Sequence, residues 1–329
     1  MTGSKDVRPI YLFSLPRSGS TLVQRVLSSH PEISTAPEPW LLLPQIYLLR
    51  DGGHGAEYGG PQAARAIGEF ISRLPGGEHS YDAALRRFIL ELYAAAGQGR
   101  ETNGGPAAPP TYFLDKTPRY HFIAEELFRL FPEARFIFLW RNPLSIVASV
   151  VDTWTNGTWR LGRWRRDLFD GLDSLVSSYR AHGESSVAVR YEDLVSRPLD
   201  SWPSIFRYLD LPFDQSVLTR FASVRLDARM GDRSGPARYR ALSTEPVGKW
   251  MRTIANPLRK RWCRRYLEWI GEDRLAVMGY RLDELLRELD GVPATTRELG
   301  PDLAWMVLAR AFQFVPARHG SRMAWKDKR

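Results

Sequence analysis

The chain has 329 residues, 43% of them hydrophobic, which is long enough for one elaborated domain with a large buried core. A single cysteine, Cys263, excludes an intramolecular disulfide and a cysteine-based zinc site, and the six histidines show no metal-ligand spacing. The net charge of +9 favours a polyanionic partner, such as a phosphorylated cofactor, nucleic acid, an acidic glycan or an anionic membrane.

The first eight residues form a short polar segment that lacks the apolar region of a signal peptide. No stretch approaches the roughly 18 uncharged apolar residues of a membrane-spanning helix. The basic residues form neither long tracts nor a recognisable nucleic-acid-binding module. The sequence therefore predicts a soluble, cytoplasmic protein that does not bind nucleic acid.

The first predicted element is a strand, the apolar and β-prone run at 10–13, which is followed by a tight turn at 15–19. A helix is predicted next, because apolar residues recur at helical spacing between 20 and 27. A strand, a loop and a helix in this order aim several backbone N–H groups and the positive end of a helix dipole at one point. Such a point attracts a phosphate or sulfate; an ordinary strand-to-helix turn is the alternative.

This loop can be compared with the phosphate-binding loop of nucleotide triphosphatases, G-x-x-x-x-G-K-[ST]. When the two are aligned on Gly19, Ser20 replaces the lysine that reaches the β- and γ-phosphates, whereas Thr21 keeps the Ser/Thr position. Arg17 supplies a different cation inside the loop. The sequence therefore predicts an anion-binding loop without the triphosphate chemistry.

A rigidly held carboxylate follows the first helix. Glu38 lies between Pro37 and Pro39, which should fix the backbone in an extended turn. A carboxylate held close to an anion loop is a candidate general base. The alternative is a glutamate that begins the helix predicted after Trp40.

A second anion-binding pair is predicted in the middle of the chain. The apolar run at 135–140 suits a central parallel strand, and it ends at Arg141. Pro143 stands near the first position of the next helix, and Ser149 lies on its second turn. Ligands of open α/β sheets bind beyond the carboxyl ends of strands. Arg141 and Ser149 are therefore expected to converge on one anion at the same edge as the first loop.

The other elements are predicted from periodicity and turn residues: Gly-rich loops at 51–61 and 97–110, helices at 61–74, 81–96, 120–131, 154–181, 202–209 and 258–270, strands that run into turns at 112–119 and 186–193, and a basic irregular segment at 228–250. From about residue 302 the chain reads as an amphipathic helix with basic neighbours. That helix is expected either to dock on the protein's own core or to contact a membrane surface peripherally. We therefore divide the chain into a domain at 1–290 and a C-terminal tail at 291–329.

Four stretches resemble segments of the PAPS-dependent sulfotransferases (PAPS is 3′-phosphoadenosine 5′-phosphosulfate), nearest in motif style to the glycan- and tyrosylprotein-sulfotransferase branch. They are residues 15–22, similar to the 5′-phosphosulfate loop; 136–143 with Ser149, similar to the 3′-phosphate strand and helix; 190–194 with Pro198, a third common segment; and 115–118, similar to the Glu/Asp-Lys-Thr-Pro element of the glycan-modifying branch. The order and spacing agree over residues 8–282.

The resemblance implies an α/β fold with a P-loop-like central parallel sheet flanked by helices on both faces. It implies PAPS as the donor, with no metal required. The residues that it assigns to the donor are Pro16, Arg17, Ser18, Gly19, Ser20 and Thr21 for the 5′-phosphosulfate, Arg141 and Ser149 for the 3′-phosphate, and Tyr191, Ser243, Lys249 and Trp250 for further contacts.

The resemblance also implies the catalytic groups. Glu38 matches the catalytic glutamate of tyrosylprotein and heparan-type members, and Arg17 and Lys116 would lie near the transferred group. Cytosolic members use a histidine, for which this sequence has no convincing counterpart. In such a site an acceptor hydroxyl attacks the sulfur in line with the leaving phosphate oxygen, so positioning and electrostatics dominate the catalysis.

The expected activity is sulfuryl transfer from PAPS to a hydroxyl of a carbohydrate or glycolipid. A lipid alcohol, a peptide tyrosine and a natural-product hydroxyl stay open as acceptors. Two other classes of function also stay open. A kinase with a divergent P-loop predicts Mg²⁺-dependent ATP binding, and a non-catalytic polyanion binder predicts salt-sensitive binding that ignores Glu38→Gln. The sequence assigns no oligomeric state.

Overall fold

The computed structural model describes residues 7–50, 52–97, 101–102, 105–106, 109–224, 226 and 241–304. Most of the basic segment predicted at 228–250, with Arg233, Arg238 and Arg240, lies outside the described residues. So does the amphipathic part of the tail from residue 305 onward, together with the membrane contact predicted for it. No helix in the part of the chain that the structure covers is long and apolar enough to cross a bilayer.

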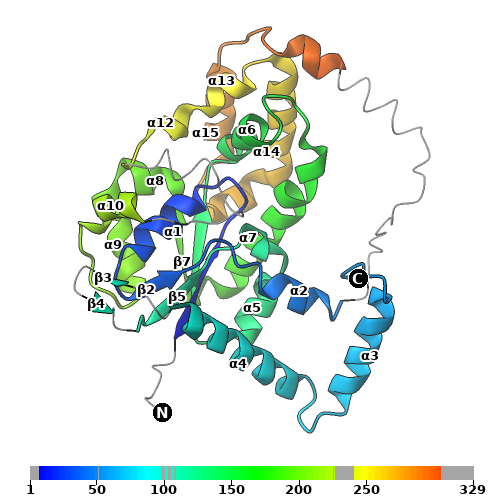
Figure 1. Cartoon of the computed structure of the whole chain (residues 1–329). Coiled ribbons are helices and arrows are strands. Elements are labelled where there is room, and N and C mark those ends of the chain that lie inside the picture. The colour runs from blue at the N-terminus through cyan, green and yellow to red at the C-terminus, as the bar shows by residue number, and fades with distance from the viewer. Residues whose placement is uncertain are drawn as a thin grey trace.

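A parallel five-stranded sheet forms the centre of the molecule (Figure 1). Its strands are β1 (Arg8–Phe13), β2 (Ile33–Thr35), β5 (Tyr112–Asp115), β6 (Arg135–Trp140) and β7 (Ser186–Arg190), in the spatial order β2-β5-β1-β6-β7. β1 therefore lies between β5 and β6, with Ile10 opposite both Leu114 and Arg135. All four pairings are parallel, so the five strands end at one edge of the sheet, where the anion site is predicted.

Helices lie between successive strands of this sheet and after the last one. They are α1 (Ser20–Ser28), α2 (Leu42–Tyr47), α3 (Gly60–Ser72), α4 (Glu78–Gly97), α5 (Ala124–Leu130), α6 (Pro143–Trp154), α7 (Leu172–His182), α8 (Tyr191–Ser196), α9 (Pro198–Tyr208), α10 (Val217–Arg220), α12 (Glu245–Gly248), α13 (Trp250–Ile254), α14 (Pro257–Val277) and α15 (Leu282–Gly291). Short 3₁₀ turns lie at η1 (Pro118–Phe122), η2 (Leu161–Trp164), η4 (Gly183–Ser185) and η5 (Phe221–Ser223), and η3 (Asp167–Gly171) is one turn of π-helix. β3 (Glu101–Thr102) pairs with β4 (Gly105–Pro106).

The two faces of the sheet bury different side chains, because alternate residues of a strand point to opposite faces. Tyr11 and Phe13 of β1 join one core cluster with helices α4, α5, α6 and α7. Ile10 and Leu12 join the other cluster with helices α1, α8 and α9. The predicted α/β fold with a parallel sheet covered on both faces is thus confirmed.

The long helix predicted at 154–181 is wrong. α6 ends at Trp154, because Asn156 and Gly157 have φ values of 50° and 81° and the Gly157 N–H turns back to the Val151 carbonyl. The chain then passes through η2 and η3 before α7 begins. Trp154 is therefore the last residue of α6 and not the first residue of a long helix.

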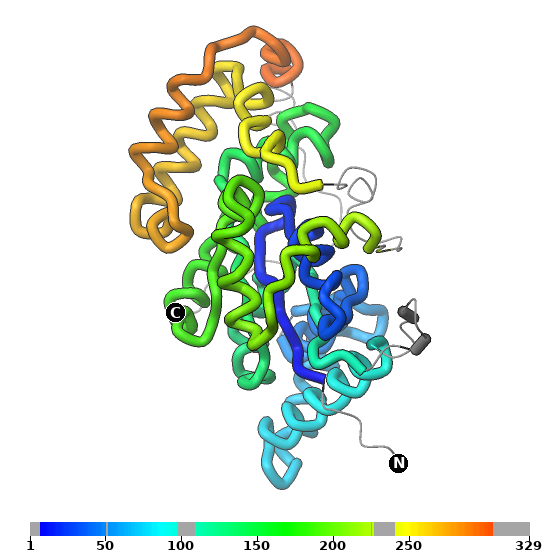
Figure 2. The backbone as a smooth tube through the Cα atoms, turned by 90° about the vertical axis from the view of Figure 1, so that its left-hand side faces the viewer, coloured from blue at the N-terminus to red at the C-terminus, as the bar shows by residue number. Residues whose placement is uncertain are grey.

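Residues beyond α15 pack on the domain through a buried ion pair. α14 and α15 lie side by side along one edge of the molecule (Figure 2). Asp302 accepts hydrogen bonds from Nε and Nη2 of Arg259 on α14, at 2.6 and 3.0 Å, and the two side chains are only 1% and 3% exposed. Arg259 also donates to the carbonyls of Thr253 and Gly157. The division of the chain at residue 290 stays a prediction, but residues 291–304 are attached to the domain at Asp302.

Asp302→Ala is expected to lower the free energy of unfolding by about 3–5 kcal/mol, because it leaves the buried Arg259 charge without its partner. Asp290→Ala is the matched control, since it breaks an exposed pair with Arg264 on the same helix and should change stability by less than about 1 kcal/mol. Urea unfolding of both variants measures the difference. Equal losses would show that the contact at Asp302 contributes no more than a surface pair.

Candidate active site

The loop between β1 and α1 contains two residues with left-handed backbone. Arg17 has a φ of 69° and Gly19 a φ of 90°. The Ser18 N–H closes the turn by donating to the Leu15 carbonyl at 3.3 Å. Gly19 lies against Tyr191, the first residue of α8, so that a Cβ atom at Gly19 would stand 2.4 Å from the ring. Both the backbone angle and the close ring therefore require glycine at this position.

Three buried polar groups around this loop have no hydrogen-bond partner within the described part of the chain. They are the hydroxyls of Ser14 and Ser18 and the Nε of Arg141. A buried polar group without a partner lowers the stability of the folded state by about 1–3 kcal/mol. Hydroxyls, a guanidinium and the N-terminus of a helix are together the donors that bind phosphate and sulfate. These residues therefore fit the anionic groups of PAPS.

Arg141 joins the end of β6 to two other segments. Its Nη1 donates to the Arg17 carbonyl at 2.9 Å, and its Nη2 donates to the Pro246 carbonyl at 3.2 Å. Its guanidinium also lies 4.4 Å from the centre of the Tyr191 ring. Arg141 is only 7% exposed. The sequence places Arg141 at the end of a central strand, and the structure adds that α12 lies against it.

Ser149 on α6 lies beside the cation of the loop. Arg17 donates from Nε to the Ser149 hydroxyl and from Nη2 to the Thr153 hydroxyl, both at 3.2 Å. The Arg17 guanidinium is also 5.6 Å from the ring centre of Trp154. Arg141 and Ser149 line the same cleft, and the Ser149 hydroxyl accepts a hydrogen bond from Arg17. That Arg141 and Ser149 bind one anion stays a prediction.

Glu38 and Lys116 form a largely buried ion pair. Lys116 Nζ lies 2.7 Å from Glu38 Oε1, and the two side chains are 2% and 12% exposed. The indole N–H of Trp40 donates to the other carboxylate oxygen at 3.4 Å. The carboxylate lines the same cleft as the anion loop. A carboxylate and a cation are thus held together next to the anion site.

The extended turn predicted at Glu38 is wrong. Glu38 and Trp40 have φ values of 35° and 55°. A residue with a side chain is destabilised in this region by about 1–3 kcal/mol, so other contacts must hold the segment there. The Trp40 N–H donates to the Thr117 hydroxyl and the Leu42 N–H to the Tyr120 hydroxyl. These contacts come from η1 and the residue just before it, which no local pattern around the prolines reveals.

The segment around α12 and α13 contributes Ser243, Lys249 and Trp250. The Ser243 hydroxyl accepts a hydrogen bond from the Glu245 N–H at 3.2 Å. Lys249 pairs with Glu245 at 3.5 Å and is half-exposed, whereas Trp250 is buried. All three predicted residues reach the cleft.

The cleft has a volume of about 1010 Å³. The residues predicted from the sequence that line it are Pro16, Arg17, Gly19, Ser20, Thr21, Glu38, Arg141, Ser149, Tyr191, Ser243, Lys249 and Trp250. Ser18 and Lys116 are buried behind this lining. Segments that lie more than 200 residues apart in the sequence thus meet in one cavity.

An aromatic wall of the cleft was not predicted. Trp154 and Trp164 stack with ring centres 4.1 Å apart and an angle of 29° between planes. Both line the cleft, as does Trp40 beside Glu38. The sequence shows tryptophan-rich stretches but no spacing that unites these three rings. The break in the helix after Trp154 brings the first two together.

Arg119 also lines the cleft. Arg119 pairs with Asp167 at 3.1 Å, and the other Asp167 oxygen lies 3.2 Å from His121 Nε2. Burial, followed by the Arg119 charge, lowers the pKa of His121 to about 3. Burial raises the pKa of Asp167. His121 is therefore uncharged at neutral pH and is enclosed by protein.

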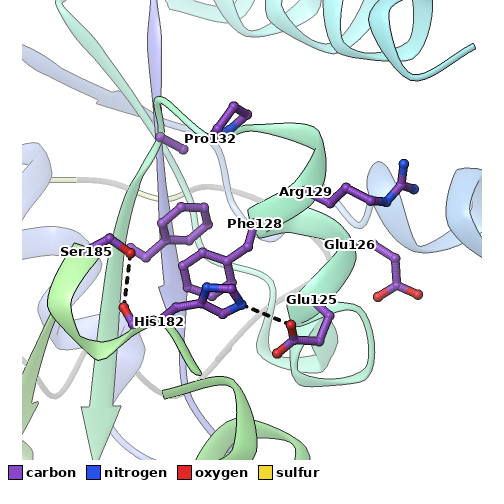
Figure 3. A pocket seen from close by; sticks show the side chains of 9 residues that line it. Glu125, Glu126, Phe128, Arg129, Pro132, His182 and Ser185 are labelled. Atoms are coloured by element: carbon purple, nitrogen blue, oxygen red, sulfur yellow. Dashed lines mark hydrogen bonds and ion pairs between the residues drawn. The ribbon is translucent and has the colours of Figure 1, made fainter. Parts of the chain in front are cut away.

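A second cavity, of about 500 Å³, lies at the opposite edge of the sheet, where β6 and β7 begin (Figure 3). Phe128 and Phe136 form its floor, and the His182 ring stacks on Phe128 with centres 3.9 Å apart. Its charged groups are paired within the chain: Glu125 with His182, Glu126 with Arg50 and Arg129 with Asp82. These charged groups thus have partners already, whereas the buried Nε of Arg141, which lines the first cleft, has none among the described residues.

Among the described residues, no group of three or more His, Cys, Asp or Glu side chains is arranged to hold a metal ion.

Comparison with known proteins gives one family. The model described as "Sulfotransferase family" matches residues 9–215. The nodulation protein NoeE of Sinorhizobium fredii is 36% identical over 156 residues, which cover 46% of this chain and 34% of that protein. Protein-tyrosine sulfotransferase 1 of Danio rerio is 22% identical, over 76% of this chain and 68% of that protein. Protein-tyrosine sulfotransferase A of Caenorhabditis elegans is 26% identical, over 74% of this chain and 61% of that protein.

The chain thus matches between about one third and two thirds of the length of these relatives. Among solved structures, the sulfotransferase domain from the curacin biosynthetic pathway is 21% identical with a TM-score of 0.48, and the match covers 76% of this chain and 92% of that domain.

Proposed function

The chain belongs to the sulfotransferase family, and we propose that it moves a sulfuryl group from PAPS to a hydroxyl of a carbohydrate or glycolipid. The observation that carries this proposal is the Glu38–Lys116 pair, held at 2.7 Å on the cleft that also contains the anion loop. A base and a cation at this place serve a transfer in which a hydroxyl loses a proton and a phosphate oxygen gains charge.

The donor would lie across the carboxyl edge of the sheet. The backbone of the loop, with Pro16, Ser18, Gly19, Ser20 and Thr21, would bind the 5′-phosphosulfate. Arg141 and Ser149 would bind the 3′-phosphate, and Tyr191, Ser243, Lys249 and Trp250 would complete the site. The buried and unpaired Nε of Arg141 and hydroxyl of Ser18 support these roles, because both are donors in need of an acceptor.

The donor supplies an electrophilic sulfur and a phosphate leaving group. In the proposed step, a bond forms between the acceptor oxygen and the sulfur while the bond from sulfur to the phosphate oxygen breaks. Glu38 takes the hydroxyl proton, and Arg17 and Lys116 neutralise the charge that grows on the leaving oxygen. The products are a sulfate ester, 3′-phosphoadenosine 5′-phosphate and the proton held by Glu38.

The acceptor is proposed to be a saccharide because of the residues that surround Glu38. The Asp115–Pro118 element resembles the glycan-modifying branch. In addition, Trp40, Trp154 and Trp164 line the cleft, and indole rings offer large apolar faces with one polar group. A peptide tyrosine is the second candidate, since several relatives are named protein-tyrosine sulfotransferases at 22% and 26% identity.

Two experiments test the proposal. Calorimetry should detect tight binding of 3′-phosphoadenosine 5′-phosphate and none of ADP with Mg²⁺; the reverse would favour the divergent kinase. Transfer of ³⁵S from labelled PAPS to mixed oligosaccharides and to tyrosine peptides should label the saccharides. Label on peptides alone would overturn the saccharide acceptor and leave sulfuryl transfer in place.

Arg141→Ala is expected to weaken binding of 3′-phosphoadenosine 5′-phosphate by about 10- to 100-fold, the equivalent of one charge-assisted hydrogen-bonding group. Binding of adenosine 5′-phosphosulfate, which lacks the 3′-phosphate, should change much less. Calorimetry with both nucleotides measures the difference.

Arg135→Ala is the matched control, because this arginine stands at the other end of the same strand and pairs with Asp210. It should leave both affinities unchanged. If Arg141→Ala weakened both nucleotides equally, Arg141 would shape the loop through the Arg17 carbonyl rather than bind the 3′-phosphate.

A further inference from the structure

A buried carboxylate organises three hydroxyl groups behind the Glu38–Lys116 pair. Asp115, the last residue of β5, is fully buried and accepts hydrogen bonds from the hydroxyls of Tyr93 at 2.6 Å, Tyr120 at 2.9 Å and Thr117 at 2.9 Å. Burial raises the pKa of Asp115, whereas the three donated hydrogen bonds lower it. Each of these hydroxyls therefore points its only proton at Asp115.

This orientation of the protons leaves the lone pairs of the hydroxyl oxygens available as acceptors. A hydroxyl has one proton to donate and lone pairs to accept with. Because Asp115 receives the protons of Thr117 and Tyr120, their lone pairs are free to accept from the backbone. The Trp40 N–H donates to Thr117 at 3.3 Å and the Leu42 N–H donates to Tyr120 at 3.2 Å. The network thus attaches the segment 38–42 to β5 and η1.

The attached segment is the one that carries Glu38. Its backbone is left-handed at Glu38 and Trp40, a conformation that other contacts must maintain. Lys116, the partner of the Glu38 carboxylate, stands between Asp115 and Thr117. One run of three residues therefore holds the side chain of Glu38 through Lys116 and the backbone of its segment through Thr117.

We infer that Thr117 and Tyr120 are positioning residues for Glu38, and that Asp115 gives both hydroxyls the orientation this requires. The inference rests on the proposed role of Glu38 as the base. Neither hydroxyl contacts the substrate in this account. Both act by keeping the carboxylate at the one place from which it can take the acceptor proton.

Thr117→Val tests the inference, because valine keeps the shape of threonine and removes the hydroxyl. The expected result is a fall in kcat of about 10- to 100-fold, as misplacement of a catalytic group by about 1 Å produces. The KM for PAPS and the affinity for 3′-phosphoadenosine 5′-phosphate should stay within about two-fold of wild type. Thr117→Ser, which restores the hydroxyl, should recover most of the rate. Tyr120→Phe should lower kcat in the same way.

Two controls remove similar hydrogen bonds elsewhere. Thr111→Val removes a hydroxyl that donates to Glu32 near the other end of β5. Tyr208→Phe removes one that accepts from the Phe136 N–H and donates to the Ser185 carbonyl, at the amino edge of the sheet. Both controls should lower the melting temperature about as much as the test variants do and leave kcat unchanged.

The outcomes separate this inference from the proposed function. If Glu38→Gln kept the wild-type rate, the proposed base would be wrong. If Glu38→Gln were inactive while Thr117→Val kept its kcat, the base would stand and the positioning role would be refuted. The positioning role would also be refuted if Thr117→Ser failed to recover the rate. It would be refuted as well if Thr117→Val lost nucleotide affinity as much as kcat, because the substitution would then have disturbed the whole site.

Discussion

Glu38→Gln is expected to lower kcat by about three orders of magnitude, within the range of roughly 10²–10⁴-fold that general-base catalysis contributes. The amide has nearly the shape of the carboxylate, so it can still accept a hydrogen bond from Lys116, which lies 2.7 Å from Glu38 in the wild type. It cannot take the acceptor proton. Binding of 3′-phosphoadenosine 5′-phosphate should be unchanged, because the nucleotide is assigned to the loop and to Arg141.

Single-turnover rates with ³⁵S-labelled PAPS, together with calorimetry, measure the two quantities. Glu126→Gln is the matched control, because Glu126 is also a partly buried glutamate in an ion pair, with Arg50 at the far edge of the sheet. It should leave kcat unchanged. Full turnover by Glu38→Gln would exclude Glu38 as the base and would leave Lys116 as a buried cation whose role must be assigned again.

Gly19→Ala is expected to weaken nucleotide binding by about 100-fold or more. At a φ of 90° the loop disfavours any side chain, by roughly 1–2 kcal/mol for a left-handed residue. The new Cβ would also stand 2.4 Å from the Tyr191 ring, so the ring or the loop must move. Because the Arg141 guanidinium stacks on that ring, a movement of the ring would disturb both ends of the donor site together.

Calorimetry measures the affinity, and the melting temperature with and without nucleotide shows whether the variant is folded. A folded variant whose melting temperature no longer rises with nucleotide is the expected result. Gly68→Ala is the control, since Gly68 lies within α3 and a Cβ there would meet nothing within 4 Å. Gly68→Ala should bind nucleotide normally. Unchanged nucleotide binding by Gly19→Ala would contradict the prediction and show that the loop tolerates a shift of Tyr191.

The parts of the site that the sequence predicted are those that a short segment encodes. The strand, turn and helix around Gly19 follow from apolar periodicity and from one glycine at a turn. Arg141 follows from its place at the end of an apolar run. In each case the residue and the element that positions it are neighbours in the chain, so composition and spacing carry the information.

The parts that the sequence did not predict depend on contacts between distant segments. The Trp40 N–H meets the Thr117 hydroxyl across 77 positions, and Arg17 meets Ser149 across 132. The left-handed backbone at Glu38 departs from the preference imposed by the following proline, and the contact with Thr117 lies two residues further along the same segment. The stacking of Trp154 on Trp164 likewise appears only once α6 ends and the chain turns back.

The place of β1 in the sheet bears on how the chain reaches its native state. β1 is the earliest strand, yet both of its partners, β5 and β6, begin about one hundred residues or more later. During synthesis the first strand has no sheet partner until residue 115 has been made, and its second partner is complete only at residue 140. Pairing over such distances is slow, and an unpaired apolar strand is prone to aggregation. We expect nascent chains that stop before β6 to require chaperones and to lack any nucleotide site.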